Sequence, residues 1–401
     1  MTSEQDNLEN SDSPLLHSLT LTNVLSFGTE SETTFNALNL LIGPNGSGKS
    51  NLIDVIDLMR STPKDLMLPI RQGGGVQDWL WKGEKKSTQL AIVNAVVTRS
   101  DDSGSLRHKF SFTAIDQRFE LNAESIEDVK ELGDSTGEMY YVLSEGDSFL
   151  KPAGGERRKE INHKFPHPSQ SILSQLRDPY QYPEITHIAQ SLEKIRIYRD
   201  WTFGRKNPAR LPQKTDLPND YLSEDASNLG LMLNSFKRIP KVKKRLLEAL
   251  RELYDGIDDY DVSVMGGTVQ VFLQEGDITI PATRLSDGTL RYLCLLAILC
   301  HPNPPPLVCI EEPELGLHPD IMPALADLLK EASTRSQLIV TTHSDELVDA
   351  MTDQPESVLV CERDEQGTTL TRLNGETLKP WLEKYRLGDL WTRGEIGGTR
   401  W

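Results

Sequence analysis

The sequence predicts an α/β fold with a mixed central sheet, an antiparallel side layer and a helical lobe. The apolar stretch 35–42 leads into a glycine-rich turn, and residues 51–59 then follow helical spacing, which indicates a strand, a loop and a helix. A second apolar strand, 307–310, ends in two carboxylates, and a third, 337–341, ends just before a histidine. Strands that end in such polar groups and alternate with helices are typical of an α/β domain.

The predicted elements divide the chain into consecutive segments. Alternating residues at 88–115 and 140–143 indicate the antiparallel layer, and amphipathic spacing at 225–236 and 241–254 indicates the helical lobe. We expect a disordered acidic tail at 1–14, a first lobe with the glycine-rich turn at 15–175, a helical and basic insertion at 176–260, a second lobe at 261–375, and a C-terminal tail at 376–401. The Arg- and Trp-rich C-terminal tail either docks a partner or packs on the chain's own surface.

Size and composition suit a globular protein. The 401 residues are 37% hydrophobic and 26% charged, enough for two or three ordinary domains or one large domain with insertions. No apolar run approaches the length of about 18 residues that a membrane span needs, and no secretory signal is visible, so we expect a cytoplasmic protein without membrane contact. The four cysteines lie in apolar segments without a Cys-x-x-Cys pair, which favours buried thiols over a zinc site.

The glycine-rich turn has the pattern of a phosphate-binding loop. Residues 43–50 read Gly-Pro-Asn-Gly-Ser-Gly-Lys-Ser and fill every fixed position of the P-loop pattern. Glycines let backbone N–H groups converge on phosphate oxygens, and the next helix directs its positive end at the same anion. We expect Lys49 to reach the β- and γ-phosphates of ATP and Ser50 to bind Mg²⁺. The predicted nucleotide-binding residues of this loop are Gly43, Asn45, Gly46, Ser47, Gly48, Lys49, Ser50 and Asn51.

Two adjacent carboxylates, Glu311 and Glu312, end the strand at 307–310. A P-loop fold places its metal-side acid and its general base at such a position. Residues 312–319, Glu-Pro-Glu-Leu-Gly-Leu-His-Pro, resemble a segment of ABC-type ATPases related to the RecF, SMC and OLD families. The resemblance implies that Glu312 polarises the attacking water and that Glu311, where most relatives have Asp, serves Mg²⁺ through a water. It also implies that residues 314–318 communicate across a dimer interface.

A further motif resembles the ABC signature, usually written LSGGQ or LSGGE. Residues 285–289 read Leu-Ser-Asp-Gly-Thr, precede an apolar helix, and lie about twenty residues before the acidic strand end. Alone, such a turn would be an ordinary helix cap. The resemblance implies that Ser286, Asp287 and Gly288 close over the γ-phosphate bound by another subunit. Asp287 departs from the commonest form, and an acid near a triphosphate should face outwards, because repulsion would weaken closure.

Two more residues follow the family pattern. His343, after the strand at 337–341, is similar to the switch histidine, which contacts the γ-phosphate. Gln175 lies between the P-loop and the signature, where the family has a glutamine that touches Mg²⁺ or the water; Gln170 and Gln181 are nearby rivals. The catalytic prediction is therefore Glu312, His343 and Gln175, and the metal prediction is Ser50, Gln175 and Glu311.

The same resemblance implies a homodimer that forms on ATP binding. Each site would combine Lys49 and Glu312 of one subunit with Ser286 of the other. About 110 residues separate Gln175 from the signature without sustained heptads, so we expect no SMC-type coiled coil. Only 58 residues follow His343, too few for the TOPRIM nuclease domain of OLD proteins, so a separate protein would cut any DNA.

The resemblance leaves the biological role open between two main readings. One is an ATP-gated ATPase of DNA repair, DNA maintenance or phage defence, and the other is a nucleotide-gated scaffold that controls a separate effector without DNA contact. The Glu-Pro-Glu run and the large insertion argue against a third reading, a transporter's nucleotide-binding subunit. The net charge of −17 requires any DNA contact to come from a local patch or a partner.

Two basic clusters are candidates for such a patch, although each would also suit a solvated face. In the first, basic and aromatic residues alternate, which favours phosphate contact with base stacking. The first cluster comprises Arg196, Arg199, Arg205, Lys206, Arg210 and Lys214 with Tyr198, Trp201 and Phe203, and the second comprises Lys237, Arg238, Lys241, Lys243, Lys244 and Arg245.

Overall fold

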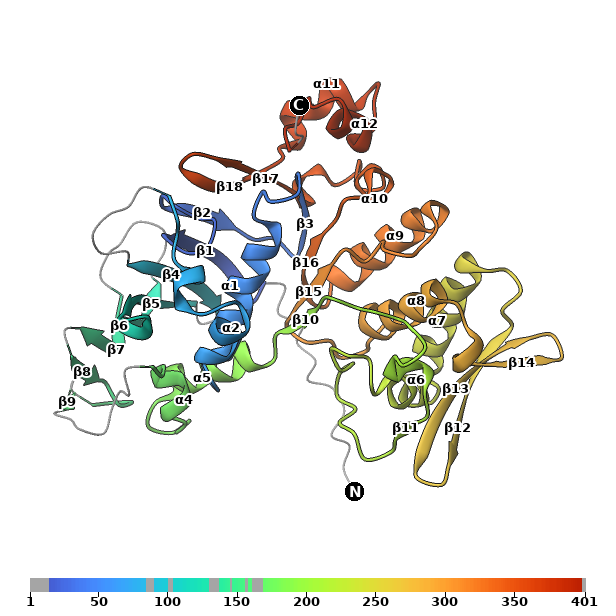
Figure 1. The fold of residues 1–401 in the computed structure, drawn as a ribbon, viewed down its shortest axis with the longest axis horizontal. Helices are drawn as coiled ribbons and strands as arrows, with labels where there is room; N and C mark the ends of the chain where they lie inside the picture. Colours follow the sequence, from blue (N-terminus) through green and yellow to red (C-terminus); the bar gives the residue numbers. More distant parts are fainter. Residues whose placement is uncertain are drawn as a thin grey trace. The chain divides into compact units, whose positions relative to one another are not determined.

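The computed structural model describes residues 14–83, 90–99, 104–129, 137–144, 146–155, 158–160 and 169–398 (Figure 1). The chain forms two compact units, each discontinuous in sequence. Unit 1 comprises Met1–Ala37, Asp54–Lys194 and Asp364–Thr369, and unit 2 comprises Leu38–Ile53, Ile195–Arg363 and Leu370–Trp401. The consecutive segments proposed from the sequence stay a prediction. The expected acidic tail at 1–14 lies almost entirely outside the described residues.

Unit 1 is built on an eight-stranded antiparallel sheet with the order β2-β1-β4-β5-β6-β7-β8-β9. Its strands are β1 (Leu16–Thr22), β2 (Ser31–Thr34), β4 (Ala91–Thr98), β5 (Ser105–Ile115), β6 (Arg118–Val129), β7 (Met139–Ser144), β8 (Asp147–Leu150) and β9 (Arg158–Glu160). Within the alternating stretch 88–115, the residues Ala91, Val93, Ala95 and Val97 lie in the core. The predicted antiparallel layer is therefore confirmed.

Helices complete unit 1. They are α2 (Met67–Gln72), α3 (Val76–Trp79), α4 (Ile172–Gln175) and α5 (Pro183–Glu193). Helix α5 begins with a proline at its first position and buries Ile185, Ile188 and Leu192, which follow helical spacing on one face.

Unit 2 contains a six-stranded sheet with the order β10-β15-β16-β3-β17-β18. The strands are β10 (Arg196–Tyr198), β15 (Leu307–Glu311), β16 (Gln337–Thr341), β3 (Leu38–Ile42), β17 (Val358–Asp364) and β18 (Gly367–Arg372). The first five are parallel. Only two residues link β17 to β18, a connection that an antiparallel pair allows, so the sheet is mixed as predicted. All residues of β3 and β16 are buried, as expected for central parallel strands.

Helices flank this sheet and carry the motifs at its edge. They are α1 (Lys49–Ser61), α8 (Asp287–Leu299), α9 (Met322–Ser333) and α10 (Asp345–Asp349). Strand β16 lies between β3 and β15, so the strand that ends in the P-loop and the strand that ends in the two acids have one strand between them (Figure 1). The boundary between the two units falls within α1.

A smaller layer of unit 2 contains β11 (Gln213–Lys214), β12 (Asp259–Met265), β13 (Thr268–Glu275) and β14 (Ile278–Pro281), all antiparallel. Helices α6 (Leu229–Phe236) and α7 (Pro240–Leu253) pack with it, and their buried residues belong to one hydrophobic core with those of α8. The two amphipathic helices expected in this region are thus confirmed.

The C-terminal segment packs on unit 2 through α11 (Gly375–Leu382) and α12 (Leu387–Thr392). The Gly388 N–H donates to Asp349 Oδ1 at 2.6 Å, and Trp391 Nε1 donates to the Gly398 carbonyl at 3.1 Å. The Gly398 N–H donates to Glu362 Oε1 at 3.0 Å, and a Cβ added to Gly398 would lie 3.5 Å from Gly43 Cα. For residues 387–398 these contacts favour packing on the chain's own surface over docking. Among the described residues, no helix is long and apolar enough to cross a bilayer.

Candidate nucleotide-binding and catalytic site

The P-loop joins β3 to α1 within unit 2. Gly43 has a φ of 146°, and a Cβ there would collide with the Cys361 carbonyl on β17, so only glycine fits this position. The Cys361 thiol donates to the Ser47 carbonyl at 3.3 Å. Strand β17 therefore packs against the P-loop and fixes its backbone at Ser47.

Lys49 folds back over the P-loop. Its Nζ donates to the Gly43 carbonyl at 2.6 Å and to the Pro44 carbonyl at 3.1 Å, and the residue is only 5% exposed. Burial lowers the pKa of Lys49, and the nearby Cys361 and carboxylates, Glu312 first among them, oppose that shift. A cation that is short of solvent and whose hydrogen bonds, within the described part of the chain, go to carbonyls is well placed to take phosphate oxygens as new partners.

Ser50 and Glu311 provide oxygen atoms for a cation. Ser50 Oγ donates to Glu311 Oε2 at 3.4 Å, although the two residues belong to different strand–loop connections. A hydroxyl and a carboxylate are hard oxygen donors of the kind Mg²⁺ prefers, so the donor set fits the predicted metal. The longer side chain of glutamate still reaches the serine, so the departure from the usual Asp does not separate the pair.

Glu312 follows β15 in a strained conformation that its neighbours fix. Its φ is +46°, a left-handed value that is uncommon for a residue other than glycine. Its N–H donates to the Thr341 carbonyl at 3.0 Å, and its carbonyl accepts from Arg291 Nη1 at 2.9 Å. The register of β15 with β16 pairs Glu311 with Thr341, so the sheet fixes the position of the backbone at Glu312. Such held strain is common at active sites.

His343 faces the same carboxylate. Its Nε2 lies 3.6 Å from Glu312 Oε1. Burial lowers the pKa of His343, and Lys49 acts in the same direction, while Glu312 opposes them. The imidazole therefore stays neutral at neutral pH and can offer one nitrogen as a donor and the other as an acceptor.

The backbone next to His343 is held by Glu314. Glu314 Oε1 accepts from the His343 N–H at 2.7 Å and from Thr342 Oγ1 at 2.8 Å. Burial raises the pKa of Glu314. The sequence assigned residues 314–318 to a dimer contact and missed this role, because the partner lies 29 residues away in the chain.

The signature turn caps α8. Ser286 Oγ accepts from the Thr289 N–H at 3.0 Å. A Cβ on Gly288 would collide with the Gly316 carbonyl, so the turn requires glycine where it approaches the 314–318 loop. Asp287 is exposed, and it forms an ion pair with Arg210. The cation that pairs with this acid is one that the sequence did not assign to it, and the orientation of Asp287 relative to a triphosphate stays a prediction.

Gln175 belongs to unit 1, so its approach to the P-loop stays a prediction. It ends α4, and its Nε2 donates to the Ser171 carbonyl at 3.3 Å. The start of α4 is held by Glu124, whose Oε2 accepts from the Ile172 N–H at 2.8 Å and whose Oε1 lies 2.9 Å from His108 Nε2. Glu124 is a residue that the sequence gave no reason to single out.

The structure removes most of the support for base stacking on the first basic cluster. Tyr198 and Phe203 are 2% and 5% exposed, so neither ring is free to stack on a base, and that part of the hypothesis is wrong. Arg210 is also buried and bonded within unit 2. The sequence could not show this, because a basic and aromatic run looks the same whether its rings face the core or solvent.

The second basic cluster is largely neutralised. Its pairs with carboxylates are Lys237–Asp261, Lys243–Asp259, Lys244–Glu248 and Arg245–Glu331. A cation already paired offers less to a phosphate backbone than a free one. The ion pairs therefore favour the alternative interpretation, in which this cluster is a solvated face.

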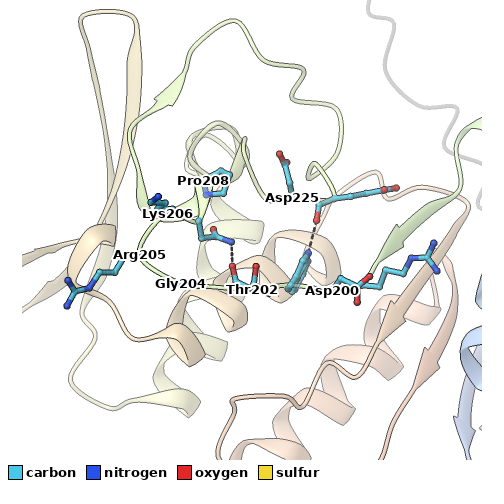
Figure 2. Close-up of a pocket in the computed structure, with 11 residues that line it drawn as sticks. Asp200, Thr202, Gly204, Arg205, Lys206, Pro208 and Asp225 are labelled. Carbon is cyan, nitrogen blue, oxygen red and sulfur yellow. Dashed lines mark hydrogen bonds between the residues drawn. The ribbon is translucent and has the colours of Figure 1, made fainter. Parts of the chain in front are cut away.

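The loop that follows β10 lines a surface pocket of about 680 Å³. Figure 2 shows that loop residues such as Asp200, Thr202, Arg205 and Lys206 line it, with Asp225 opposite them. A smaller pocket of about 240 Å³ shares Trp201 with it and reaches Glu311 and Glu312. The loop after β10 thus lines both pockets, and the smaller one reaches the two acids predicted for the site.

The P-loop, the acids one strand away and the histidine between them define a P-loop ATPase head. Residues 38–349 match the family described as "AAA domain, putative AbiEii toxin, Type IV TA system", and the chain belongs to that family. Membership and fold together confirm the ABC/SMC-like ATPase class that the motifs indicated.

Sequence relatives lie among chromosome partition proteins. Over 162 residues the chain is 28% identical to "Chromosome partition protein Smc" of Mycolicibacterium paratuberculosis (strain ATCC BAA-968 / K-10). It is 27% identical over 162 residues to the protein of the same name from Mycobacterium tuberculosis (strain ATCC 25618 / H37Rv). Each match covers 36% of this chain but only 13% of the relative.

Solved structures support the same fold. One is described as "Crystal structure of the SmcHead bound to the C-winged helix domain of ScpA", with a TM-score of 0.57 and 15% identity over 91% of this chain and 99% of that one. Another, an Smc head with an extended coiled coil from Pyrococcus furiosus bound to the C-terminal domain of ScpA, has a TM-score of 0.56 and 14% identity over 93% of this chain and 99% of that one. At such identities the likeness concerns the fold alone.

Proposed function

We propose that this chain binds ATP with Mg²⁺ and hydrolyses it in a site that a second copy completes. The observation that carries the proposal is the meeting of Ser50, Glu311, Glu312 and His343 at one edge of the unit 2 sheet, next to Lys49. Phosphoryl transfer to water needs positioning and charge stabilisation more than covalent chemistry, and this edge offers both.

In this proposal the chain's own groups divide the work. The P-loop N–H groups and Lys49 hold the β- and γ-phosphates, and Glu312 accepts a hydrogen bond from the attacking water and orients it in line with the leaving oxygen. Neutral His343 donates to the γ-phosphate or positions the same water. Ser50 and Glu311 would hold Mg²⁺, and Gln175 is a further candidate; the metal supplies charge neutralisation at the phosphates.

The second copy would contribute its signature turn. In each unit 2, Ser286 lies at an exposed turn at the start of α8, and its hydroxyl, which here pairs with Thr289 Oγ1, would turn to the anion beside the first N–H groups of the helix. ATP would join two heads, and hydrolysis would release them.

The decisive variant is Glu312→Gln. We expect it to bind ATP and to hydrolyse it about 100-fold more slowly or worse, because the amide cannot accept the water's proton. The ATP-bound dimer should then accumulate, which analytical ultracentrifugation measures. Lys49→Ala serves as the control, since it should lose both ATP binding and the dimer. Normal turnover by Glu312→Gln would show that another group is the base.

We consider two biological roles for this ATP-controlled dimer. A role in DNA repair, DNA maintenance or phage defence is one candidate. The ion pairs that neutralise the second basic cluster favour the other candidate, a nucleotide-gated scaffold that controls a separate effector. The matched family's description, which names a toxin and a type IV TA system, supports the same reading. A partner-dependent ATPase rate that DNA leaves unchanged would support the scaffold, and a DNA-stimulated rate would contradict it.

A further inference from the structure

The signature turn carries a charge that the proposed function leaves unexplained. Asp287 is the first residue of α8, and its side chain is 67% exposed. In the proposed dimer this end of α8 meets the triphosphate held by the other copy. A carboxylate there would repel the phosphates, since like charges at short range disfavour each other.

A buried arginine lies against this carboxylate. Arg210 is 8% exposed, and its Nη2 forms the ion pair with Asp287 Oδ1. Its Nη1 donates to the Leu285 carbonyl at 2.5 Å, and its Nε donates to the Phe203 carbonyl at 3.0 Å. One guanidinium therefore holds both the side chain and the backbone of the signature turn. Burial of such a cation is tolerated only when its donors are satisfied in this way.

The loop that presents Arg210 is itself held in place. Trp201 Nε1 donates to the Glu224 carbonyl at 2.7 Å, and Asn207 Nδ2 donates to the Thr202 carbonyl at 2.8 Å (Figure 2). Asn207 Oδ1 also accepts from the Ala209 N–H at 2.8 Å and caps the short 3-10 helix Pro208–Arg210. The orientation of the guanidinium is therefore set within one subunit, before any nucleotide arrives.

We propose that Arg210 is a positioning residue that neutralises Asp287 and holds the signature turn in the shape that receives the partner's triphosphate. This inference rests on the proposed function. Where the commonest signature has glycine, no carboxylate needs to be neutralised, so the acid and the arginine form a matched pair in this chain. In the described part of the chain, the hydrogen bonds and the ion pair given above for both residues lie within the signature turn and the loop after β10 of their own subunit.

The test is a double-mutant cycle in the Glu312→Gln background, read as the ATP-driven dimerisation constant. Arg210→Gln keeps an amide donor for the Leu285 carbonyl but leaves Asp287 unpaired, and it should weaken dimerisation about tenfold or more. Adding Asp287→Gly should restore most of that loss. Raising the salt concentration should strengthen dimerisation of Arg210→Gln, because salt screens the exposed repulsion.

Two measurements separate this role from simple structural support. Binding of a fluorescent ATP analogue to the monomer should stay unchanged in Arg210→Gln, because the turn serves the other subunit's nucleotide. Asp287→Asn keeps Arg210 and its backbone bonds, so it should fold normally and dimerise about two- to threefold more tightly, since the positive charge of Arg210 is then no longer balanced by a carboxylate as the phosphates approach.

The outcomes distinguish the two proposals. If Asp287→Gly fails to rescue Arg210→Gln, or if Asp287→Asn weakens the dimer, the arginine only supports the backbone and the charge-pair proposal is overturned. If the Glu312→Gln protein binds ATP but stays monomeric, the dimer proposal fails and this inference fails with it. Dimerisation without rescue defeats this inference alone.

Discussion

Two parts of unit 2 are proposed to meet phosphate groups, and they are built in different ways. The P-loop, the two acids predicted for catalysis and metal binding, and His343 lie at the ends of β3, β15 and β16, whose parallel register fixes them together. The signature turn lies at the exposed start of α8 and depends on individual tethers from Ser286 and Arg210. A strand cannot shift its register without moving all of its buried apolar side chains. The hydrogen bonds that hold the signature turn, in contrast, can be lost one at a time. Substitutions in the first part should therefore abolish ATP binding, whereas substitutions in the second part should weaken dimerisation step by step.

The largest effect is expected at Gly43. In Gly43→Ala the new Cβ meets the Cys361 carbonyl at a φ that disfavours side chains, so β3 or β17 must move. We expect ATP binding to be lost and the free energy of unfolding to fall by about 1–3 kcal/mol. Nucleotide titration and thermal denaturation measure the two effects.

The matched comparison is Gly288→Ala, where the new Cβ meets the Gly316 carbonyl instead. This monomer should still bind ATP and should lose only dimerisation. Equal losses of ATP binding in the two alanine variants would contradict the difference drawn between the two parts.

A smaller effect is expected at Arg291, which joins the two parts. Arg291 lies on α8, and its Nη1 and Nη2 donate to the carbonyls of Glu312 at 2.9 Å and Trp201 at 3.1 Å. Lysine lacks the planar fork, so Arg291→Lys should release the backbone of Glu312 and lower kcat about tenfold with ATP affinity unchanged. Arg245→Lys, in an ion pair with Glu331, is the control and should leave kcat unaltered. A change in ATP affinity without a change in kcat would remove the positioning role from Arg291.

The smallest expected effect is the pH dependence from His343. Its pKa lies below the ordinary value of 6.5, so the unfolded chain takes up this proton before the folded one as the pH falls. The contribution of His343 to stability is therefore complete above about pH 6.5 and decreases as the pH falls towards the lowered pKa. The part of the acid limb of kcat that comes from His343 should also lie below pH 6.5 and should be absent from His343→Asn. An acid limb above pH 6.5 would contradict the burial effect.

The sequence predicted the parts of the site that local pattern encodes. A glycine-rich turn between an apolar strand and a helix identified residues 43–50, and buried strands that end in polar groups identified Glu311, Glu312 and His343. The alternation at 91–97 likewise predicted the antiparallel layer, because period two is visible in a short window. The order of strands then brings these ends together, as the class of fold requires.

Long-range partners were not visible in the same way. Arg210 and Asp287 are 77 residues apart, and Arg245 and Glu331 are 86 apart, so no window of sequence contains either pair. The sequence therefore places Arg210 in a basic cluster, whereas the structure pairs it with Asp287 of the signature turn. For the same reason, the sequence overestimates the number of cations that are free to bind nucleic acid, because it shows the basic residues of a cluster but not the carboxylates that pair with them.

The contact of Gly398 with the P-loop has a practical consequence. Gly398 is held by Glu362 and Trp391, and a Cβ added to it would lie 3.5 Å from Gly43 Cα. A side chain introduced at residue 398 would therefore press on the first residue of the P-loop. A fluorophore attached there would report movements of Gly43 but would also disturb the loop, so assays of ATP binding are better served by a label elsewhere in the chain.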